Sequence, residues 1–436
     1  MAAPGRHDDS RSATPGGPLW GAGPAPPVAL VVLIVLVGTT VSIAYHYVLA
    51  AYAGLKYPWN TFLFAPKDHF KDYFNVYRHA QEFRPGVSGN MVYSPLLHLV
   101  MTVLNVVPAW VGFALMIAAF VATLAALLWM WTMCLIGNRV VRAVFVAVLG
   151  LLAYPVLYVL DRGNLEMLVF VTLAAFFYLY YWRRSPYAWV ALSLAIAAKY
   201  YWGSLVVLLL LDRRGRQAVA CVIGAAAVTV SSAVAIALLS GYSLADVFAK
   251  LSSTLAGHAN GTTGSEDVVA YSHNLWAWVI SIDGWTDWVL YWGPVQRIYL
   301  VAAGVIFVLV VRRLMVGDFA DWQKATALVA CTLVLPLESK DYTLVHLLLP
   351  LTLFAATWRS GRRAWASAAL FGLLLIPLDY YYFNFLYWRS LVSTAVLVYP
   401  LLLVGLIVVA LWEGDTRDSL PGGGRTPEEA DMVERP

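Results

Sequence analysis

Charged residues are scarce in this sequence of 436 residues: they make up 12% of the chain, whereas hydrophobic residues make up 61%. A soluble domain usually carries about 25% charged residues and about 45–50% apolar ones. The deficit of charge therefore excludes an ordinary soluble enzyme. Together with a mean hydropathy of +0.70, it predicts a polytopic integral membrane protein.

Cysteine is also rare, and the three present, Cys134, Cys221 and Cys331, all lie inside apolar stretches. An odd and scattered set argues against a disulfide framework and against a metal cluster. No His, Asp or Cys group has the spacing of metal ligands, and the sequence lacks the G-x-x-x-x-G-K-[ST] motif that would suggest a nucleotide-sugar donor. The arginines stand in short pairs between apolar runs, so the net charge of +4 is no nucleic-acid signal. We therefore expect no cofactor, no metal and no nucleic-acid partner.

The two ends of the chain lack long hydrophobic runs. Residues 1–27 are rich in Pro, Gly, Ser and Ala, and residues 415–436 are similarly polar, so we expect both to be disordered cytoplasmic tails. Residues 28–414 between them are predicted to form one transmembrane domain.

A helical membrane span needs about 20 apolar residues. Ten segments are candidates: 28–50, 110–136, 140–160, 165–182, 217–240, 297–316, 322–337, 341–358, 364–379 and 392–412. The stretch 186–211 has basic residues at both flanks and Lys199 in its middle, so we predict a hairpin of two short helices with Lys199 at the far turn. The ten segments and the two helices of the hairpin make about 12 spans, which places both tails on the cytoplasmic side.

The basic residues test this topology. Every short cytoplasmic turn between the spans carries at least two Lys or Arg residues, as the positive-inside rule requires. The long outer loops are then residues 51–109 and 241–296. The second half of the first loop is predicted to contain a helix lying along the membrane surface. We expect a multi-pass protein of the plasma membrane.

Ionisable residues gather on the outer face in this topology. The run LDRGNLEMLVF, residues 160–170, caps a pair of helices there, and the residues of this and the other charged turns are Asp68, Asp72, Asp161, Arg162, Glu166, Lys199, Glu338, Lys340, Asp341 and His346. Arg162, Lys199 and Lys340 stand on the side where basic residues are otherwise disfavoured. Such cations suit a lipid-linked anion, because Arg and Lys bind phosphate, and a nearby carboxylate could act as a general base.

The same run carries a resemblance to a known family. LDRGNLEMLVF, followed by YYWRRSPYAWVALSLAIAAKYYWGSLVVLLLLDRRGR, resembles the central signature of glycosyltransferase family 87. These are membrane-embedded GT-C enzymes whose donor is a sugar, typically mannose, linked to polyprenyl phosphate. The matching residues are Asp161, Arg162, Gly163, Asn164, Glu166 and Lys199. Weaker matches lie in DYFNVYRHA, YSPLLHLV, YSHNLWAWV and LPLESKDYTLVHLLLPL, so the resemblance spans roughly residues 68–355.

The chain departs from the family pattern at two points. The family usually has a proline shortly after the lysine, where this chain has Trp202 and Gly203. The family aspartate directly precedes a phenylalanine, whereas here Tyr73 follows Asp72. The choice between Asp72 and Asp68 as the matching aspartate therefore stays open.

The resemblance implies an all-α polytopic membrane protein with the GT-C fold and an active site on the extracytoplasmic face. It implies transfer of a sugar, in the first place mannose, from a polyprenyl-phosphate donor to a hydroxyl of a glycolipid or glycan acceptor, with inversion and without a metal. Asp72, with Asp68 as the alternative, is the expected base, and Arg162, Lys199 and Lys340 are the expected phosphate ligands. The other expected substrate-binding residues are Asp161, Asn164, Glu166, His273, Asn274, Asp341 and His346.

Two other classes of protein compete with this prediction. A membrane acyltransferase or polymer ligase would use a long outer loop with a histidine, either His258 or His273. An arabinosyltransferase is an alternative among the enzymes that use lipid-linked sugars. A transporter of lipid-linked glycans would place its charges at mid-depth, often with internal repeats. We find no repeat, and the charges cluster at one face, which favours the transferase.

Overall fold

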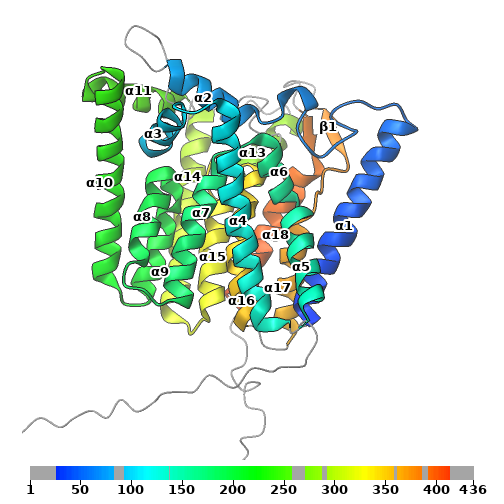
Figure 1. The fold of residues 1–436 in the computed structure, drawn as a ribbon. Helices are drawn as coiled ribbons and strands as arrows, with labels where there is room; N and C mark the ends of the chain where they lie inside the picture. The colour runs from blue at the N-terminus through cyan, green and yellow to red at the C-terminus, as the bar shows by residue number, and fades with distance from the viewer. Residues whose placement is uncertain are drawn as a thin grey trace, which may run out of the picture.

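The structure, a computed structural model, describes residues 26–82, 93–136, 138–257, 271–286, 292–357, 361–384 and 391–412. The predicted C-terminal tail and residues 1–25 of the predicted N-terminal tail lie outside these ranges. The described chain is a bundle of helices with one small two-stranded sheet (Figure 1). This architecture agrees with the predicted all-α membrane protein.

Among the described residues, four helices are long and apolar enough to cross a membrane. They are α1 (Pro26–Ala51), α4 (Ala109–Leu135), α10 (Gly215–Ser240) and α14 (Trp292–Val316). A helix of 26 residues, such as α1, is about 39 Å long and exceeds the ~30 Å thickness of a hydrocarbon core. Only 17% of the apolar segment of α14 is buried against the rest of the protein. Most of this helix is therefore free to contact lipid.

A bent pair of helices is a fifth candidate span. α5 (Arg139–Leu151) and α6 (Tyr154–Arg162) meet at a bend of 50°. Pro155 stands in the first turn of α6, where its missing N–H removes no helical hydrogen bond. The chain thereby restarts as a second helix, which ends at Arg162.

Shorter helices make up the remainder of the bundle. They are α7 (Glu166–Phe177) with its π-helical extension η2 (Tyr178–Trp182), α8 (Ala188–Ala198), η3 (Tyr200–Leu205), α9 (Val206–Leu211), α15 (Asp321–Val334), η5 (Asp341–Leu347), α16 (Leu348–Thr357), α17 (Arg362–Leu374) and α18 (Thr394–Ala410). α8 and η3 meet at Lys199, as the predicted hairpin requires. α15 has 14 residues and α16 has 10, so each is shorter than a full span, and most of their residues are buried against other helices. The count of about 12 spans therefore stays a prediction.

One end of the bundle, which we call the upper end, carries most of the remaining elements (Figure 1). α2 (Lys71–Glu82), α3 (Pro95–Leu104) and α11 (Leu244–Gly257) lie there. η1 (Pro66–Asp68), α13 (Leu275–Thr286) and the antiparallel strands β1 (Tyr382–Asn384) and β2 (Leu391–Ser393) complete it, with Phe383 opposite Val392. α3 occupies the part of the first loop where we expected a surface helix.

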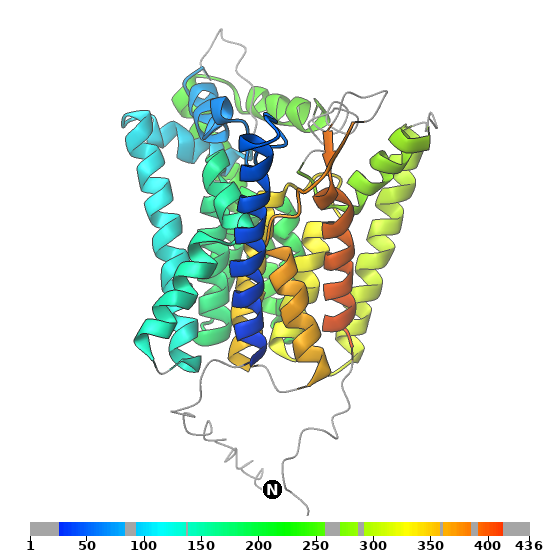
Figure 2. The ribbon, with the colours of Figure 1, turned by 90° about the vertical axis from the view of Figure 1, so that its right-hand side faces the viewer.

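The opposite end, which we call the basal end, contains the start of α1 and the end of α18 (Figure 2). The first described helix thus begins, and the last one ends, at the same end of the bundle. Arg184 Nη2 lies 3.2 Å from Asp321 Oδ2, and Lys324 Nζ lies 3.2 Å from Asp212 Oδ1. These ion pairs tie together turns that we predicted to be cytoplasmic.

Cysteine labelling should separate the two ends. We expect a membrane-impermeant maleimide added to intact cells to label Lys56→Cys and Ser253→Cys, because both positions are exposed near the upper end. Arg183→Cys and Arg362→Cys, exposed at the basal end, should react only after the cells are opened. The native Cys221 and Cys331 are buried and should give little background, and Cys134 is replaced by Ser in every variant. Labelling of all four positions from the same side would contradict the topology.

Candidate active site

The carboxylate of Asp72, in the first turn of α2, receives hydrogen bonds from the end of α6. Arg162 forms a two-pronged ion pair with it: Nη2 contacts Oδ1, and Nε donates to Oδ2 at 3.2 Å. The side-chain amide of Asn164 donates to Oδ2 at 2.6 Å. A bidentate Arg–carboxylate pair adds geometric specificity as well as interaction energy. The contacts therefore hold the Asp72 carboxylate in one position.

The turn between Arg162 and Asn164 depends on Gly163. This residue ends α6 in the left-handed conformation, with φ of +61°, which glycine adopts without steric cost. After the turn, Asn164 Oδ1 accepts the backbone N–H of Glu166 at 2.9 Å, at the start of α7. The Asp-Arg-Gly-Asn run thus ends one helix, starts the next and presents two side chains to Asp72.

Replacement of Gly163 by Ala should destabilise this turn. A left-handed residue with a Cβ costs about 1–2 kcal/mol, and the new Cβ would lie 3.1 Å from both Phe70 Cα and Phe113 Cε2. We expect a lower midpoint of thermal unfolding in detergent. Gly304→Ala in α14 is the matched control, because a Cβ there meets no atom within 4 Å. An unchanged midpoint for Gly163→Ala would contradict this account of the turn.

A second carboxylate, that of Glu166, lies deeper in the protein and is fully buried. Its Oε1 accepts the Tyr201 hydroxyl at 2.6 Å and lies 3.3 Å from Lys199 Nζ. Its Oε2 lies 3.7 Å from Nε2 of the buried His346 and takes no hydrogen bond from the described residues. Because Asn164 contacts both Asp72 and Glu166, one continuous set of contacts runs from Asp72 to Lys199. We call this set the Asp72–Lys199 network.

Aromatic rings flank the cations of this network. The Arg162 guanidinium lies 3.8 Å from the centre of the Phe64 ring, and Lys199 Nζ lies 4.9 Å from that of Tyr93. Burial raises the pKa of Tyr93 well above its ordinary value, so it stays an uncharged phenol. Trp202, which stands where the family pattern has proline, packs its ring 4.5 Å from that of His346. Such rings exclude water and strengthen the electrostatic interactions between the charges.

Asp161 and Asp68 play different parts from Asp72 in the structure. Asp161 accepts the backbone N–H of Phe64 at 2.9 Å and pairs with His69 at 3.1 Å, so it fastens the segment that leads into α2. Asp68 pairs with the half-exposed Lys71 at 3.0 Å. The described contacts of Asp68 therefore lie at the surface, outside the Asp72–Lys199 network.

The remaining predicted residues form a second polar cluster beside α13. His273 Nδ1 lies 3.2 Å from Asp341 Oδ1, and Tyr154 donates to Asp341 Oδ2 at 3.1 Å. Asn274 Oδ1 accepts the N–H of Ala277 and caps α13. Burial lowers the pKa of His273.

Lys340 lies at the edge of this second cluster and pairs with Ser272 through a backbone bridge. The contacts of these side chains thus divide the predicted residues into two groups. Asp72, Arg162, Asn164, Glu166, Lys199 and His346 meet in or beside the network, whereas His273, Asn274, Lys340 and Asp341 meet in the second cluster.

Three side chains of the network escaped the sequence analysis, namely Phe64, Tyr93 and Tyr201. Tyr93 is the first residue of the motif YSPLLHLV, and Tyr201 lies two residues after Lys199 in KYYW. Both therefore lie within or next to the motifs that carry the family resemblance. Phe64 had no such signal. Within the part of the chain that the structure describes, no three His, Cys, Asp or Glu side chains come together as metal ligands do.

Comparison with known protein families identifies a match. The model of glycosyltransferase family 87 matches residues 91–337, more than half of the chain. The matched range contains Arg162, Asn164, Glu166 and Lys199, whereas Asp72 and His346 lie just outside it. No curated protein and no solved structure matches the chain.

Proposed function

Because this chain belongs to glycosyltransferase family 87, we propose that it moves a mannosyl residue from a polyprenyl-phosphate donor to a hydroxyl of a glycolipid or glycan. It is a membrane glycosyltransferase, as the family and the long apolar helices show. The donor, the acceptor, the plasma membrane and the extracytoplasmic face are parts of the proposal. The observation that carries it is the Asp72–Lys199 network, in which two carboxylates and two cations meet at helix ends.

Asp72 is the proposed general base. The acceptor hydroxyl would give its proton to an Asp72 oxygen while its own oxygen attacks C1 of the donor sugar. The bond between C1 and the phosphate oxygen breaks, and its electron pair leaves with the polyprenyl phosphate. A single displacement of this kind inverts the configuration at C1. The fixed orientation of the carboxylate supports the role, since general-base catalysis depends first on geometry.

Arg162 and Lys199 are the proposed ligands of the departing phosphate. Arg162 Nη1 is buried and donates to no residue that the structure describes, so its two N–H bonds are available for a ligand. When Asp72 takes the acceptor proton it loses its charge, at the moment when the phosphate gains one. Arg162 can then interact more strongly with the phosphate through Nη1 while Nη2 and Nε keep their place on Asp72, and a cation that is already in position stabilises developing charge without reorganisation.

The proposal is tested by assaying the purified full chain in lipid nanodiscs. Radiolabelled polyprenyl-phosphate mannose is supplied with a panel of glycolipids and free glycans, and labelled product is separated from donor. We expect labelled product, released polyprenyl phosphate and inversion at C1. Transfer only from an arabinose donor would overturn the choice of sugar. Movement of labelled donor across proteoliposomes without any transfer would overturn the function.

A further inference from the structure

The two ion pairs of the Asp72–Lys199 network balance each other's charge. Asp72 pairs with Arg162, and Glu166 pairs with Lys199. The proposed donor is a phosphodiester, so it brings one further negative charge to this site. An unbalanced charge is costly where water is excluded. Donor binding is therefore most favourable if one more positive charge forms in or beside the network.

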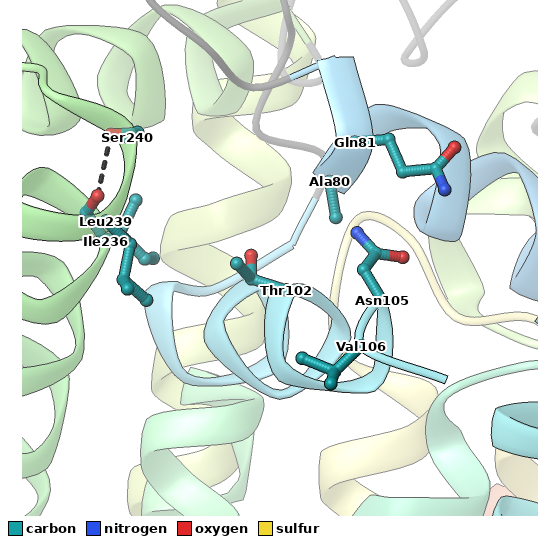
Figure 3. A pocket seen from close by; sticks show the side chains of 8 residues that line it. All are labelled: Ala80, Gln81, Thr102, Asn105, Val106, Ile236, Leu239 and Ser240. Carbon is teal, nitrogen blue, oxygen red and sulfur yellow. Dashed lines mark hydrogen bonds between the residues drawn. The ribbon is translucent and has the colours of Figure 1, made fainter. Parts of the chain in front are cut away.

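A hollow of about 290 Å³ between α2, α3 and α10 cannot supply that charge (Figure 3). Its lining consists of Ala, Val, Leu, Ile, Thr, Ser, Asn and Gln side chains, none of which is ionisable. The residues beside Glu166, by contrast, include a histidine.

The imidazole of the buried His346, in η5, presents a hydrogen-bond acceptor to Glu166. Its Nδ1 donates to the carbonyl oxygen of Thr343 at 2.9 Å, because a carbonyl can only accept. In the neutral imidazole Nε2 therefore carries the lone pair. Nε2 faces Glu166 Oε2 at 3.7 Å, beyond hydrogen-bonding distance, and neither atom has a hydrogen-bond partner among the described residues. Two acceptors thus face each other, and one added proton would join them.

Lys199 and Glu166 differ in their access to a ligand. The Lys199 side chain is 22% exposed, whereas that of Glu166 is fully buried. An anion can therefore reach the ammonium group from its open side while the carboxylate stays enclosed. As the ammonium group turns to the anion, its interaction with Glu166 Oε1 weakens. The carboxylate then keeps the hydroxyl of Tyr201 but loses much of its counter-charge.

Few other charges act on the His346 imidazole. The charged groups that face it are Glu166 from α7 and Lys199 from the junction of α8 and η3. α16, which packs against η5, has no ionisable side chain. The charged residues of α6, α15 and η5 itself pair with other side chains. The protonation of His346 therefore depends chiefly on how far Lys199 neutralises Glu166.

We propose that binding of the anionic donor is coupled to the uptake of one proton by His346, which then replaces Lys199 as the counter-ion of Glu166. The inference rests on the proposed function, because it concerns the donor site. The proton comes from water and binds Nε2, and the new N–H donates to Glu166 Oε2. His346 is thus a positioning residue that frees Lys199 for the phosphate.

The charges balance at each step of this scheme. The donor adds one negative charge, and the proton on His346 adds one positive charge. During transfer the phosphate gains a second negative charge while Asp72 loses its own by taking the acceptor proton. The site therefore stays neutral from donor binding to product.

The first test counts protons by calorimetry. Farnesyl-phosphate mannose, a soluble short-chain donor, is titrated into the full chain in nanodiscs, in buffers with different heats of ionisation. The slope of the measured heat against the buffer heat gives the number of protons taken up. The phosphodiester does not titrate near neutral pH, so any uptake belongs to the protein. We expect about 0.5–1 proton per donor, and a Kd that rises with pH by at most about tenfold per pH unit.

His346→Gln and Glu166→Gln should each abolish the uptake. A glutamine at position 346 offers an uncharged N–H donor that cannot titrate, and one at position 166 removes the carboxylate that needs a counter-charge. His98→Gln is the matched control. His98 is buried in α3, and burial, with the nearby His79 as a smaller cause, lowers its pKa to about 4, so it is neutral near pH 7. Uptake should persist in this control. Uptake that persists in His346→Gln, or tight donor binding to the parent chain without uptake, would overturn the inference.

Lys199→Met tests the same coupling without a donor. Methionine removes the charge, so Glu166 loses its cation as it does when the donor binds. Folded Lys199→Met should then hold the His346 proton more tightly than an unfolded histidine does. The stabilisation from this proton is complete where an unfolded histidine is protonated, and it is lost as the pH rises beyond that range. Relative to the parent chain, we expect the thermal midpoint of Lys199→Met to fall between about pH 6 and about pH 9.

The double variant Lys199→Met/His346→Gln should lack this fall, because it has no histidine to titrate. A level midpoint for Lys199→Met, or an equal fall in the double variant, would overturn the inference. If the midpoints behave as expected but the short-chain donor does not bind, the proposed function fails while the link between Lys199 and His346 stands. The two proposals therefore fail separately.

Discussion

Replacement of Asp72 by Asn should lower the turnover of sugar transfer by about 10²-fold or more, the lower range for losing a positioned general base. The amide has nearly the shape of the carboxylate but cannot take a proton. Donor binding should be at least as tight as before, because Arg162 loses the carboxylate that now occupies it. Turnover is measured with saturating donor, and donor affinity is measured separately by equilibrium binding.

Asp68→Asn is the matched control for this prediction. The two aspartates are four residues apart, yet Asp68 pairs with Lys71 at the surface while Asp72 contacts Arg162 and Asn164. We expect Asp68→Asn to turn over at close to the normal rate. If Asp68→Asn were inactive while Asp72→Asn stayed active, Asp68 would be the general base. Activity in both variants would contradict any role for a carboxylate of this loop.

The sequence predicted the helices better than the contacts between them. Long apolar runs and paired arginines placed the long helices and the turn at Lys199, because both signals are local. The pairing of Asp72 with Arg162 joins residues that are 90 positions apart. No local pattern encodes such a contact, so the sequence could not choose between Asp72 and Asp68. The structure separates them by what each one touches.

The sequence also could not divide the predicted substrate-binding residues by role. A polar side chain in an apolar segment looks the same whether it meets a ligand or another side chain of the protein. His273 and Asp341 pair with each other, and Asn274 Oδ1 caps α13. The pairing is enough to explain the burial of His273 and Asp341. Glu166 Oε2 and His346 Nε2 lie 3.7 Å apart, and neither they nor Asn274 Nδ2 has a hydrogen-bond partner among the described residues. Glu166, His346 and Asn274 are therefore the stronger candidates for ligand contact.

Replacement of Lys199 by Ala should have the second large effect, on donor affinity and on stability. The test must distinguish a Lys199 that binds the donor phosphate from one that only neutralises the Glu166 carboxylate. Lys199→Ala removes one charge-assisted contact, which should cost about 1.5–3 kcal/mol of donor affinity, or about 10- to 150-fold in Kd. It also leaves Glu166 fully buried without its cation, and breaking a buried pair costs about 3–5 kcal/mol of stability. The single variant therefore loses both donor affinity and stability, and cannot by itself assign the role.

The double variant Lys199→Ala/Glu166→Gln separates these effects, because it removes both charges of the pair together. If Lys199 binds the donor phosphate, the double variant should recover most of the lost thermal stability but none of the lost donor affinity. If Lys199 only neutralises Glu166, stability and affinity should recover together. Glu166→Gln alone should bind the donor at least as tightly as the parent chain, since Lys199 is then freed. Recovery of donor affinity in the double variant would therefore remove Lys199 from the phosphate site and leave Arg162 as its cation.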